Sequence, residues 1–380
     1  MSKKNINNRK VILFAVNKKH KLFFDKFKIF NCDIKIVYTR KIFKLSFISI
    51  KYLNKVNLSN AIELRIMDFY AKRRFAYLTP KILVRIVYKI LAIINYMRYF
   101  SEIDKDYNKI VLWNGFTFRQ AIAVEIAKLY SIKPIYVENG FLPNRIVIDK
   151  RGVNFYNSVP RDINFFVNYK NDKDLPKKLI PRNPKNVNKF SKLKEEVLPN
   201  EYIFIPFQVD YDTQIMLFSP WIKNMNELFH IIESISFKLN LNFVFKEHPS
   251  SKKNYPKLYE KIKNNSKLYF INSYSTQELI QRSEAVITIN SSVGIESLLF
   301  YKKVIVLGQA FYKINSITKW ADNKDELIKI LKNLESWKVD SNLIDNFLKY
   351  LYYDYLIEGN FIENNEIQMK KIKKIICKKF

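Results

Sequence analysis

Glycine is scarce in this sequence, with six residues among 380, and cysteine and histidine are scarcer still, with two and three. Neither cysteine belongs to a CxxC pair or to a spacing typical of zinc ligands, which argues against a structural zinc site. Two isolated cysteines also predict no disulfide framework and suit a reducing compartment. In a chain with so little glycine, each one that remains indicates a backbone that needs a positive φ or a close approach.

Long uninterrupted apolar runs are also missing. Only six apolar residues follow the basic ones at the start, too few for a signal peptide, so we expect residues 11–16 to form a first buried strand. The most apolar long stretch, 80–100, is interrupted by lysine and arginine and does not fit a membrane-spanning helix. An amphipathic helix lying on anionic lipid remains open, but we favour a helix that packs on the core.

Acidic residues are few relative to basic ones, 35 against 66, and the formal net charge is +31. This balance favours anionic partners such as nucleic acid, an acidic membrane surface or a phosphorylated substrate. The abundance of Lys, Asn, Ile, Tyr and Phe is also typical of an AT-rich genome, so the charge has a purely compositional explanation as well. An apolar fraction of 48% is enough for a packed core and excludes global disorder.

What the sequence does contain is an alternation of short apolar strands with helical stretches, on both sides of a Pro- and Lys-rich segment at 172–200. This alternation predicts parallel sheets with helices on their faces. The predicted strands are 11–16, 34–39, 109–115, 134–140, 202–208, 241–249, 268–272, 285–290 and 303–308.

The predicted fold class is therefore α/β, with two Rossmann-like parallel-sheet halves and a cleft between them. GT-B-type glycosyltransferases have this architecture, but so do several epimerases and binding proteins, and the fold alone does not choose among them. We expect domains at 1–190 and 200–345, followed by a basic helical tail at 346–380.

Polar residues gather at the predicted carboxyl ends of strands, where open α/β sheets bind their ligands. Asn290 ends one strand and leads through Ser291 and Ser292 into a helix. One serine suffices as the N-cap, and two hydroxyls at a helix N-terminus predict a site for an anion. Gly294 lies in the same turn. Glu296 is placed either to bind a ribose or base, or simply to complement the helix dipole.

The strand at 241–249 ends in another polar group, Lys246-Glu247-His248-Pro249. Strand alternation places Lys246 and His248 on one face, where both side chains would donate hydrogen bonds to one phosphate. Pro249 restricts the chain that follows them. A lone histidine is usually structural, but this position at a strand terminus favours a functional role.

In the first half of the chain, two predicted strands end in Asn-Gly, at Asn114-Gly115 and at Asn139-Gly140. Glu138 precedes the second pair, and a carboxyl group desolvated in a cleft is suited to general acid/base catalysis. The alternative is a solvated turn with a capping role.

A further polar group, Gln208, Asp210 and Asp212, follows the strand at 202–208. Metal-dependent nucleotide-sugar transferases use Asp-x-Asp after a strand to hold Mg²⁺ or Mn²⁺. One of the aspartates fits equally well as a carboxylate nucleophile, and the residues by themselves leave both readings open.

In this order, the segments ENGFLPN, KRGVN, FQVDYDTQI, KEHP and INSSVGIESLLFYKKVIVLGQAFY resemble the capsule polysaccharide biosynthesis family, over residues 109–312. Members of that family include capsule β-Kdo transferases that begin a poly-Kdo linker on a phosphatidylglycerol lipid. The layout is also similar to that of bacterial sialyltransferases, which use CMP-activated keto-sugars and adopt GT-B folds.

For the donor side, the resemblance implies that Lys246 and His248 neutralise the phosphate of CMP. Ser291 and Ser292 would hold the same phosphate or the cytidine. Since these groups stabilise a single phosphate charge without a divalent ion, the resemblance implies neither a metal nor another cofactor, and Asp210 has no metal role.

For the chemistry, the resemblance implies that Asp212 is the nucleophile of a retaining transferase and that Glu138 is the acid/base. Many relatives carry Asp at the position of Asn139. An asparagine cannot act as the base there, which disfavours the sialyltransferase interpretation.

The activity expected from the resemblance is transfer of Kdo from CMP-Kdo to an anionic lipid or glycolipid during capsule assembly. Such a protein would be cytoplasmic and peripheral at the inner membrane, near other capsule assembly proteins, with helix 80–100 and the basic tail as membrane contacts. The alternatives are a transferase of the same fold that uses CMP-sialic acid or a UDP-sugar, and a non-catalytic polysaccharide- or nucleic-acid-binding protein. Since no zinc spacing or RNP-like aromatic motif is present, nucleic acid is not an expected partner.

Overall fold

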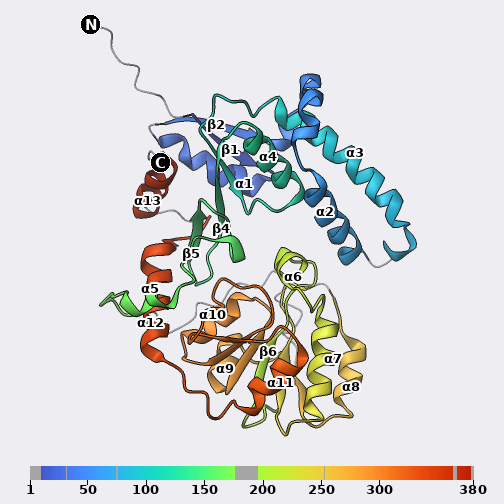
Figure 1. Cartoon of the computed structure of the whole chain (residues 1–380), viewed down its shortest axis with the longest axis vertical. Coiled ribbons are helices and arrows are strands. Elements are labelled where there is room, and N and C mark those ends of the chain that lie inside the picture. Colours follow the sequence, from blue (N-terminus) through green and yellow to red (C-terminus); the bar gives the residue numbers. More distant parts are fainter. Residues whose placement is uncertain are drawn as a thin grey trace. The chain divides into compact units, whose positions relative to one another are not determined.

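The computed structural model describes residues 10–30, 32–73, 76–175, 196–251, 253–362 and 366–377, and within them the chain forms two compact units (Figure 1). Unit 1 takes its described residues from Met1–Gly140, Asn144–Ser158 and Leu356–Phe380, and unit 2 from Phe141–Pro143 and Val159–Tyr355. Each unit contains one six-stranded, mainly parallel sheet with helices packed on it. The predicted α/β class with two Rossmann-like halves is therefore confirmed.

The sheet of unit 1 has the strand order β12-β5-β4-β3-β1-β2. Its strands are β1 (Lys10–Ala15), β2 (Asp33–Tyr38), β3 (Lys109–Trp113), β4 (Lys133–Asn139), β5 (Arg145–Asp149) and β12 (Ile357–Glu358). The parallel ladder from β2 to β4 was predicted, because strands buried on both faces read as continuous apolar runs. The antiparallel strands β5 and β12 were not predicted.

Five longer helices belong to unit 1: α1 (Lys18–Asp25), α2 (Ser59–Lys72), α3 (Lys81–Phe100), α4 (Phe118–Leu129) and α13 (Glu366–Cys377). In α3, Val84, Tyr88, Ala92 and Tyr96 recur every fourth residue and are buried, which confirms the predicted core-packing face. Within the described part of the chain, no helix is long and apolar enough to cross a membrane.

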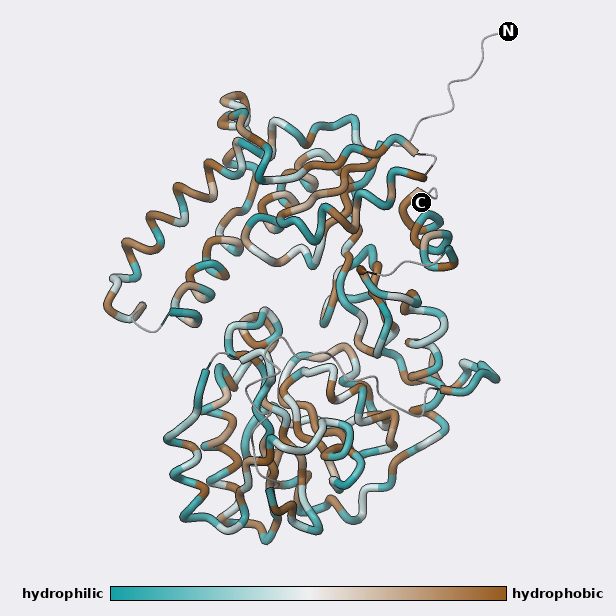
Figure 2. The backbone as a smooth tube through the Cα atoms, turned by 180° about the vertical axis from the view of Figure 1, so that it is seen from behind, coloured by the Kyte–Doolittle hydropathy of each residue, from teal (hydrophilic) through white to brown (hydrophobic). Residues whose placement is uncertain are grey.

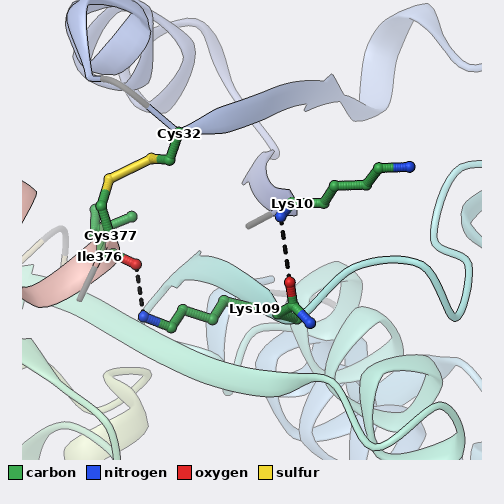
Figure 3. The surroundings of a disulfide bond; sticks show 6 residues. Lys10, Cys32, Lys109, Ile376 and Cys377 are labelled. Atoms are coloured by element: carbon green, nitrogen blue, oxygen red, sulfur yellow. Dashed lines mark hydrogen bonds between the residues drawn. A yellow bond between two sulfur atoms is a disulfide. The ribbon is translucent and has the colours of Figure 1, made fainter. Parts of the chain in front are cut away.

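The C-terminal segment returns to unit 1 instead of forming a separate tail. Strand β12 pairs with β5, and Met369, Ile372 and Ile376 of α13 lie in the core formed with β1 and β4. The Nζ of Lys109 donates a hydrogen bond to the carbonyl of Ile376 at 2.7 Å (Figure 3). The chain thus divides differently from the expected boundary between residues 345 and 346. Unit 2 continues to Tyr355, and the residues from Leu356 onward belong to unit 1.

This return also brings the two cysteines together. Cys32 and Cys377 form a disulfide across 345 residues of sequence, with their Cα atoms 6.2 Å apart (Figure 3). The expectation of no disulfide was therefore wrong. It rested on local spacing, which carries no information about a contact made by a distant helix.

The sheet of unit 2 has the order β11-β10-β9-β6-β7-β8, and all of its ladders are parallel. Its strands are β6 (Ile203–Pro206), β7 (Phe243–Lys246), β8 (Leu268–Phe270), β9 (Ala285–Thr288), β10 (Lys303–Val306) and β11 (Lys319–Trp320). Its helices are α5 (Ile163–Asn168), α6 (Thr213–Phe218), α7 (Met225–Ser236), α8 (Pro256–Ile262), α9 (Thr276–Arg282), α10 (Ser292–Leu298), α11 (Lys324–Lys332) and α12 (Ser341–Lys349).

Local sequence explains where several of these helices begin. The Asn224 side chain accepts from the N–H of Glu227 at the start of α7, and Ser275 with Glu278 forms a reciprocal capping box on α9. Of the segment predicted as the linker, residues 176–195 lie outside the described residues.

Candidate functional site

In unit 2, the loops that follow β6, β7 and β9 leave the sheet at the same edge, because the three strands are parallel neighbours. We call this edge the polar edge. Its members are Gln208, Asp210, Asp212, Lys246, His248, Asn290, Ser291 and Ser292. All eight were candidates from the sequence, and the structure shows which of them contact one another.

Gln208 and Asn290 connect the loops after β6 and β9. Gln208 Nε2 donates to Asn290 Oδ1 at 3.0 Å, and the N–H of Asn290 donates to Gln208 Oε1 at 3.2 Å. Asn290 Nδ2 donates to the carbonyls of Gln214 and Phe218 at 2.9 and 3.2 Å, which holds the α6 segment against the loop. Both side chains are buried, so the network braces the loops.

Asp210 braces the same edge from the other side. Its Oδ1 accepts from the N–H of Met225, the first residue of α7, at 2.8 Å. Its Oδ2 accepts from Lys253 Nζ at 2.8 Å, and the aspartate side chain is only 12% exposed. The carboxylate therefore neutralises a lysine and complements a helix N-terminus.

Asp212 has a different environment, because it is exposed and caps α6. Its Oδ1 accepts from the N–H of Gln214 at 2.9 Å and lies 3.4 Å from the hydroxyl of Thr213. One carboxylate oxygen thus fixes the side chain at the polar edge. Within the described residues Oδ2, the oxygen that would act as a nucleophile, makes no hydrogen bond.

Lys246 ends β7 and is held by the neighbouring strand. Its Nζ donates to the carbonyls of Asn272 and Tyr274 at 2.8 and 2.7 Å. Burial lowers the pKa of Lys246 to about 8, so the ammonium is still mostly protonated near neutral pH. The predicted pairing of Lys246 and His248 on one phosphate stays a prediction, but Lys246 also serves to connect β7 to the end of β8.

His248 has a defined ring orientation. Its Nδ1 accepts a hydrogen bond from the N–H of Ser250 at 3.1 Å, and its own carbonyl accepts from the N–H of Ser251 at 2.9 Å. With Nδ1 as the acceptor, a neutral ring carries its proton on Nε2, which is the nitrogen that would donate to an anion. Pro249 lies within this turn.

Sequence reasoning missed the buried carboxylate beside His248. Glu247 is 4% exposed, and its Oε1 accepts from the hydroxyl of Tyr259 at 2.7 Å. The same hydroxyl accepts from Asn272 Nδ2 at 2.7 Å, and Asn272 Oδ1 accepts from the N–H of Glu247 at 2.9 Å. Neither Tyr259 nor Asn272 stands out in the sequence, because the cluster depends on a contact between β7, α8 and the end of β8.

Ser291 is the N-cap of α10, and its Oγ accepts from the N–H of Val293 at 3.2 Å. Ser292 is the first helical residue, so the serine doublet provides one cap and one further hydroxyl, as predicted. Glu296 follows in the same short helix and is half-buried.

Gly294 is required by a protein contact. A Cβ at this position would lie 2.7 Å from the hydroxyl oxygen of Tyr312 and 2.9 Å from its Cε2. That hydroxyl donates to the carbonyl of Ser291 at 2.6 Å, and burial raises the pKa of Tyr312. The close approach expected at this glycine is therefore that of a buried tyrosine, which fixes the start of α10.

In unit 1, Glu138 lies near the end of β4 and is held by two asparagines. Asn114 Nδ2 donates to its Oε2 at 2.8 Å, and the N–H of Asn139 donates to its Oε1 at 2.9 Å. Asn114 and Gly115 both have positive φ, 66° and 85°, which turns the chain sharply after β3. Gly140 begins the turn from β4 to β5, and its N–H donates to the carbonyl of Arg145 at 2.7 Å.

A buried histidine at the same end of the unit 1 sheet was not a candidate from the sequence. His20 stacks on Trp113, with ring centroids 4.4 Å apart, and its Nε2 lies 3.0 Å from Asn17 Nδ2. Burial lowers the pKa of His20 to about 4, so the ring is neutral at pH 7. Asn17 lies two residues after the end of β1, and the rule applied to the other strand ends would have found it.

Among the described residues, no three His, Cys, Asp or Glu side chains gather in a way that could hold a metal ion. Asp210 is paired with Lys253, and Asp212 caps a helix. The two aspartates of Asp-x-Asp thus have separate structural partners. The expectation of metal-independent chemistry remains a prediction.

Comparisons with known proteins match most of the chain to one family. The family model described as capsule polysaccharide biosynthesis protein matches residues 108–186 and 185–362. Protein FixF of Sinorhizobium fredii (strain NBRC 101917 / NGR234) is 33% identical over 273 residues, which cover 71% of this chain and 66% of FixF. The capsule polysaccharide export protein KpsS of Escherichia coli is 26% identical, over 50% of this chain and 64% of KpsS. The chain thus spans just under two thirds of the length of these relatives.

Among solved structures, the KpsC β-Kdo 2,7 transferase of Thermosulfurimonas dismutans aligns with 96% of this chain and 97% of its own length. The sequence identity is 12% and the TM-score is 0.47. A similarity at this level assigns no activity, and the Kdo transfer in its name is a property of that enzyme.

Proposed function

Because the chain belongs to the capsule polysaccharide biosynthesis protein family, we propose that it is a glycosyltransferase of capsular polysaccharide assembly. The reaction is transfer of Kdo from CMP-Kdo to a phosphatidylglycerol-type lipid or a glycolipid. The observation that carries the proposal is the polar edge, where the exposed Asp212, the N-cap of α6, lies on the same set of braced loops as His248 and the serine pair.

The donor is assigned to unit 2. The phosphate of CMP-Kdo accepts hydrogen bonds from His248 Nε2 and from the hydroxyl of Ser292, and Lys246 contributes positive charge near the same edge. Gln208 and Asn290 do not bind the donor in this account. They hold the loops after β6 and β9 at fixed positions, which lowers the cost of ordering them around a ligand.

The chemistry is a double displacement. The Asp212 carboxylate attacks the anomeric carbon of Kdo, and the bond to the phosphate breaks with its electron pair leaving on CMP. The acceptor hydroxyl then attacks the same carbon while Glu138 takes its proton, and the bond to Asp212 breaks. Two inversions at one carbon retain the configuration.

No divalent ion takes part in this reaction, because a cationic side chain and hydrogen-bond donors stabilise the single charge that develops on the leaving phosphate. The acceptor lipid requires a peripheral protein at a membrane surface that works with other capsule assembly proteins. The expected location at the inner face rested in part on free cysteines, and the Cys32–Cys377 disulfide does not fit a reducing compartment.

The proposal is tested by incubating the protein with CMP-Kdo and a short-chain phosphatidylglycerol, with and without EDTA, and detecting the product by mass spectrometry. We expect transfer that survives EDTA and is lost in Asp212→Asn, since asparagine keeps the α6 cap but is not a nucleophile. Asp162→Asn is the matched control, because Asp162 caps α5 through the same contact, 3.0 Å from the N–H of Asn164.

Three outcomes would overturn the proposal. Transfer from CMP-sialic acid or a UDP-sugar in place of CMP-Kdo would assign another donor to the same edge. Loss of transfer in EDTA would restore a metal role for the aspartates. No transfer from any nucleotide sugar, together with salt-sensitive binding of polysaccharide or nucleic acid, would indicate a non-catalytic protein.

A further inference from the structure

Helix α3 has two apolar faces, and the protein covers only one of them. Opposite its buried residues lies a row of apolar side chains that are 36% to 62% exposed. They are Ile82, Leu83, Ile86, Val87, Ile90, Leu91, Ile93 and Ile94. The hydrophobic stretches of this helix are brown in Figure 2. A contiguous exposed set of this kind marks an interaction surface in a soluble fold.

A second exposed apolar segment is attached to the same helix. Residues 43–50 include five large apolar side chains that are 39% to 85% exposed, namely Phe43, Leu45, Phe47, Ile48 and Ile50. The second segment leads into the 3₁₀ helix η3 (Phe47–Lys55). Arg98 of α3 donates to the carbonyls of Thr39 and Ile42, both at 2.9 Å. The hydroxyl of Tyr96 donates to the carbonyl of Ser49 at 3.1 Å. The two segments are therefore fixed to each other, and we call the exposed apolar side chains of α3 and of residues 43–50 together the α3/η3 surface.

Most of the charge around this surface is positive, although Glu63 of α2 is ion-paired with Arg85 of α3 at 2.8 Å. Residues 34–62 and 69–101 contain no Asp or Glu. The exposed basic residues in these stretches and in the described part of the chain include Arg40, Lys41, Lys44, Lys51, Lys55, Lys81 and Lys89. Apolar side chains interspersed with lysine are typical of segments that lie on an anionic membrane, with the apolar groups among the acyl chains and the ammonium groups at the phosphates. A second copy of this chain would bring like charge against like charge.

A pocket in the same region suits part of a lipid molecule. It has a volume of about 320 Å³ and lies between the end of η3, the loop that follows it, α2 and α3. Its apolar lining is Leu53, Val56, Leu58, Ile62 and Ile93. Lys89 lines it as well, which places an ammonium beside an apolar cavity, as an acyl chain next to a phosphate requires.

The C-terminal helix, the other membrane contact expected from the sequence, lacks such a face. Met369, Ile372 and Ile376 of α13 are buried in the core of unit 1, and the disulfide holds the end of the helix against that unit. Lys370, Lys371 and Lys374 remain exposed, but a row of lysines without an apolar face attracts lipid only weakly at physiological salt.

We propose that the α3/η3 surface docks on the surface of an anionic phospholipid bilayer, with the outer face of α3 inserted at the level of the headgroups. This rests on the proposed function in so far as a lipid acceptor requires an enzyme that reaches the membrane, and it names the surface that does so. Docking itself needs neither donor nor acceptor and is measured without them.

The test is co-sedimentation of the full chain with vesicles of phosphatidylglycerol and phosphatidylcholine. The variant Ile82→Gln/Ile86→Gln/Ile90→Gln removes apolar groups along one stripe while keeping a good helix former at each position. We expect at least tenfold weaker binding of the triple variant at an unchanged melting temperature. Lys81→Gln/Lys89→Gln should bind a few-fold more weakly, and wild type should bind pure phosphatidylcholine vesicles poorly.

The matched control is Lys371→Gln/Lys374→Gln on α13, which removes the same charge and should bind like wild type. Binding of the triple variant within twofold of wild type would overturn the proposal, as would binding that depends on α13. A wild-type dimer that the triple variant dissociates, without vesicle binding, would assign the surface to a second copy of the chain.

Failure of the docking proposal and failure of the proposed function give different results. If the triple variant loses vesicle binding but transfers sugar to a short-chain acceptor in detergent, the surface serves docking and the site is intact. If wild type transfers no sugar but still binds vesicles through α3, docking stands and the proposed function fails.

Discussion

In both sheets of this protein, polar residues follow the carboxyl ends of the strands, but these residues serve different purposes in the two units. In unit 2, the side chains after β6 and β9 mostly bind one another: Gln208 and Asn290 share two hydrogen bonds, and Asp210 neutralises Lys253. In unit 1, Glu138 is held by Asn114 and Asn139, and the buried His20 of α1 stacks on Trp113 at the end of the adjacent strand β3.

This difference shows that a polar residue after a strand either braces a loop or is presented by it, and that the sequence does not distinguish the two. The burial of the side chain and its hydrogen-bond partners distinguish the two roles. Asp210 and Asp212 are two residues apart, yet one is 12% exposed and ion-paired, and the other is exposed at a helix cap. We therefore assign chemistry to the presented residues and stability to the bracing ones.

The largest expected effect concerns Glu138, the carboxylate of unit 1 that is held by neutral donors. Glu138→Gln keeps a side chain of the same shape but cannot accept a proton, and we expect kcat to fall by about 10²–10³-fold with little change in KM or melting temperature. Steady-state kinetics with CMP-Kdo and a short-chain acceptor measure this. An unchanged kcat would move Glu138 to the bracing class.

The disulfide belongs to unit 1 alone, so its loss should affect the units unequally. We expect Cys32→Ser/Cys377→Ser to destabilise unit 1 by about 4 kcal/mol, because a very long loop is no longer closed in the unfolded chain. Hydrogen exchange should accelerate in β5 and β12 and stay the same in β9. Equal acceleration in both units would show that they unfold together.

His20 should make unit 1 sensitive to acid. Its pKa is about 4 in the folded protein against 6.5 in the unfolded chain, so between these values the unfolded chain binds the extra proton. The contribution of His20 to the free energy of unfolding is therefore present at neutral pH and is lost as the pH falls. The loss is about 3 kcal/mol at pH 4. His20→Phe keeps an aromatic ring on Trp113 and should flatten the dependence of unit 1 stability on pH from 6.5 to 4. An unchanged slope would contradict the assignment.

Bracing and presented residues of unit 2 are compared directly by two substitutions. Gln208→Leu leaves Oδ1 and the backbone N–H of Asn290 without their partner, and we expect a loss of about 2 kcal/mol in the free energy of unfolding. Ser292→Ala removes a hydroxyl at the first helical position and should change stability by less than about 0.5 kcal/mol while weakening donor binding. Equal stability losses in chemical denaturation would remove the distinction.

Much of the fold was predictable, because strands such as β1, β3, β6 and β9 are short apolar runs that end in turn residues. The antiparallel edge of unit 1 was not. β5 is a single short run after a turn, and β12 has two residues, whose partners lie more than two hundred positions earlier in the chain.

The candidate site was predictable to the extent that it follows strand ends. Asp212, His248 and the serine pair lie where parallel strands place them, and Ser291 caps its helix as expected. The bracing partners were not predictable, because Lys253, Tyr259 and Asn272 reach the edge from α8 and the loops around it. Gly294 likewise depends on Tyr312, which follows the next strand.

The central claim, that Asp212 forms a covalent bond with the transferred sugar, is tested most directly by intact-mass measurement. The Glu138→Gln variant is incubated with CMP-Kdo in the absence of acceptor, so that an intermediate forms but is not passed on. The account predicts a mass increase of one Kdo residue, which peptide mapping places on Asp212. A protein that transfers Kdo yet shows no adduct, or an adduct on another residue, would contradict it.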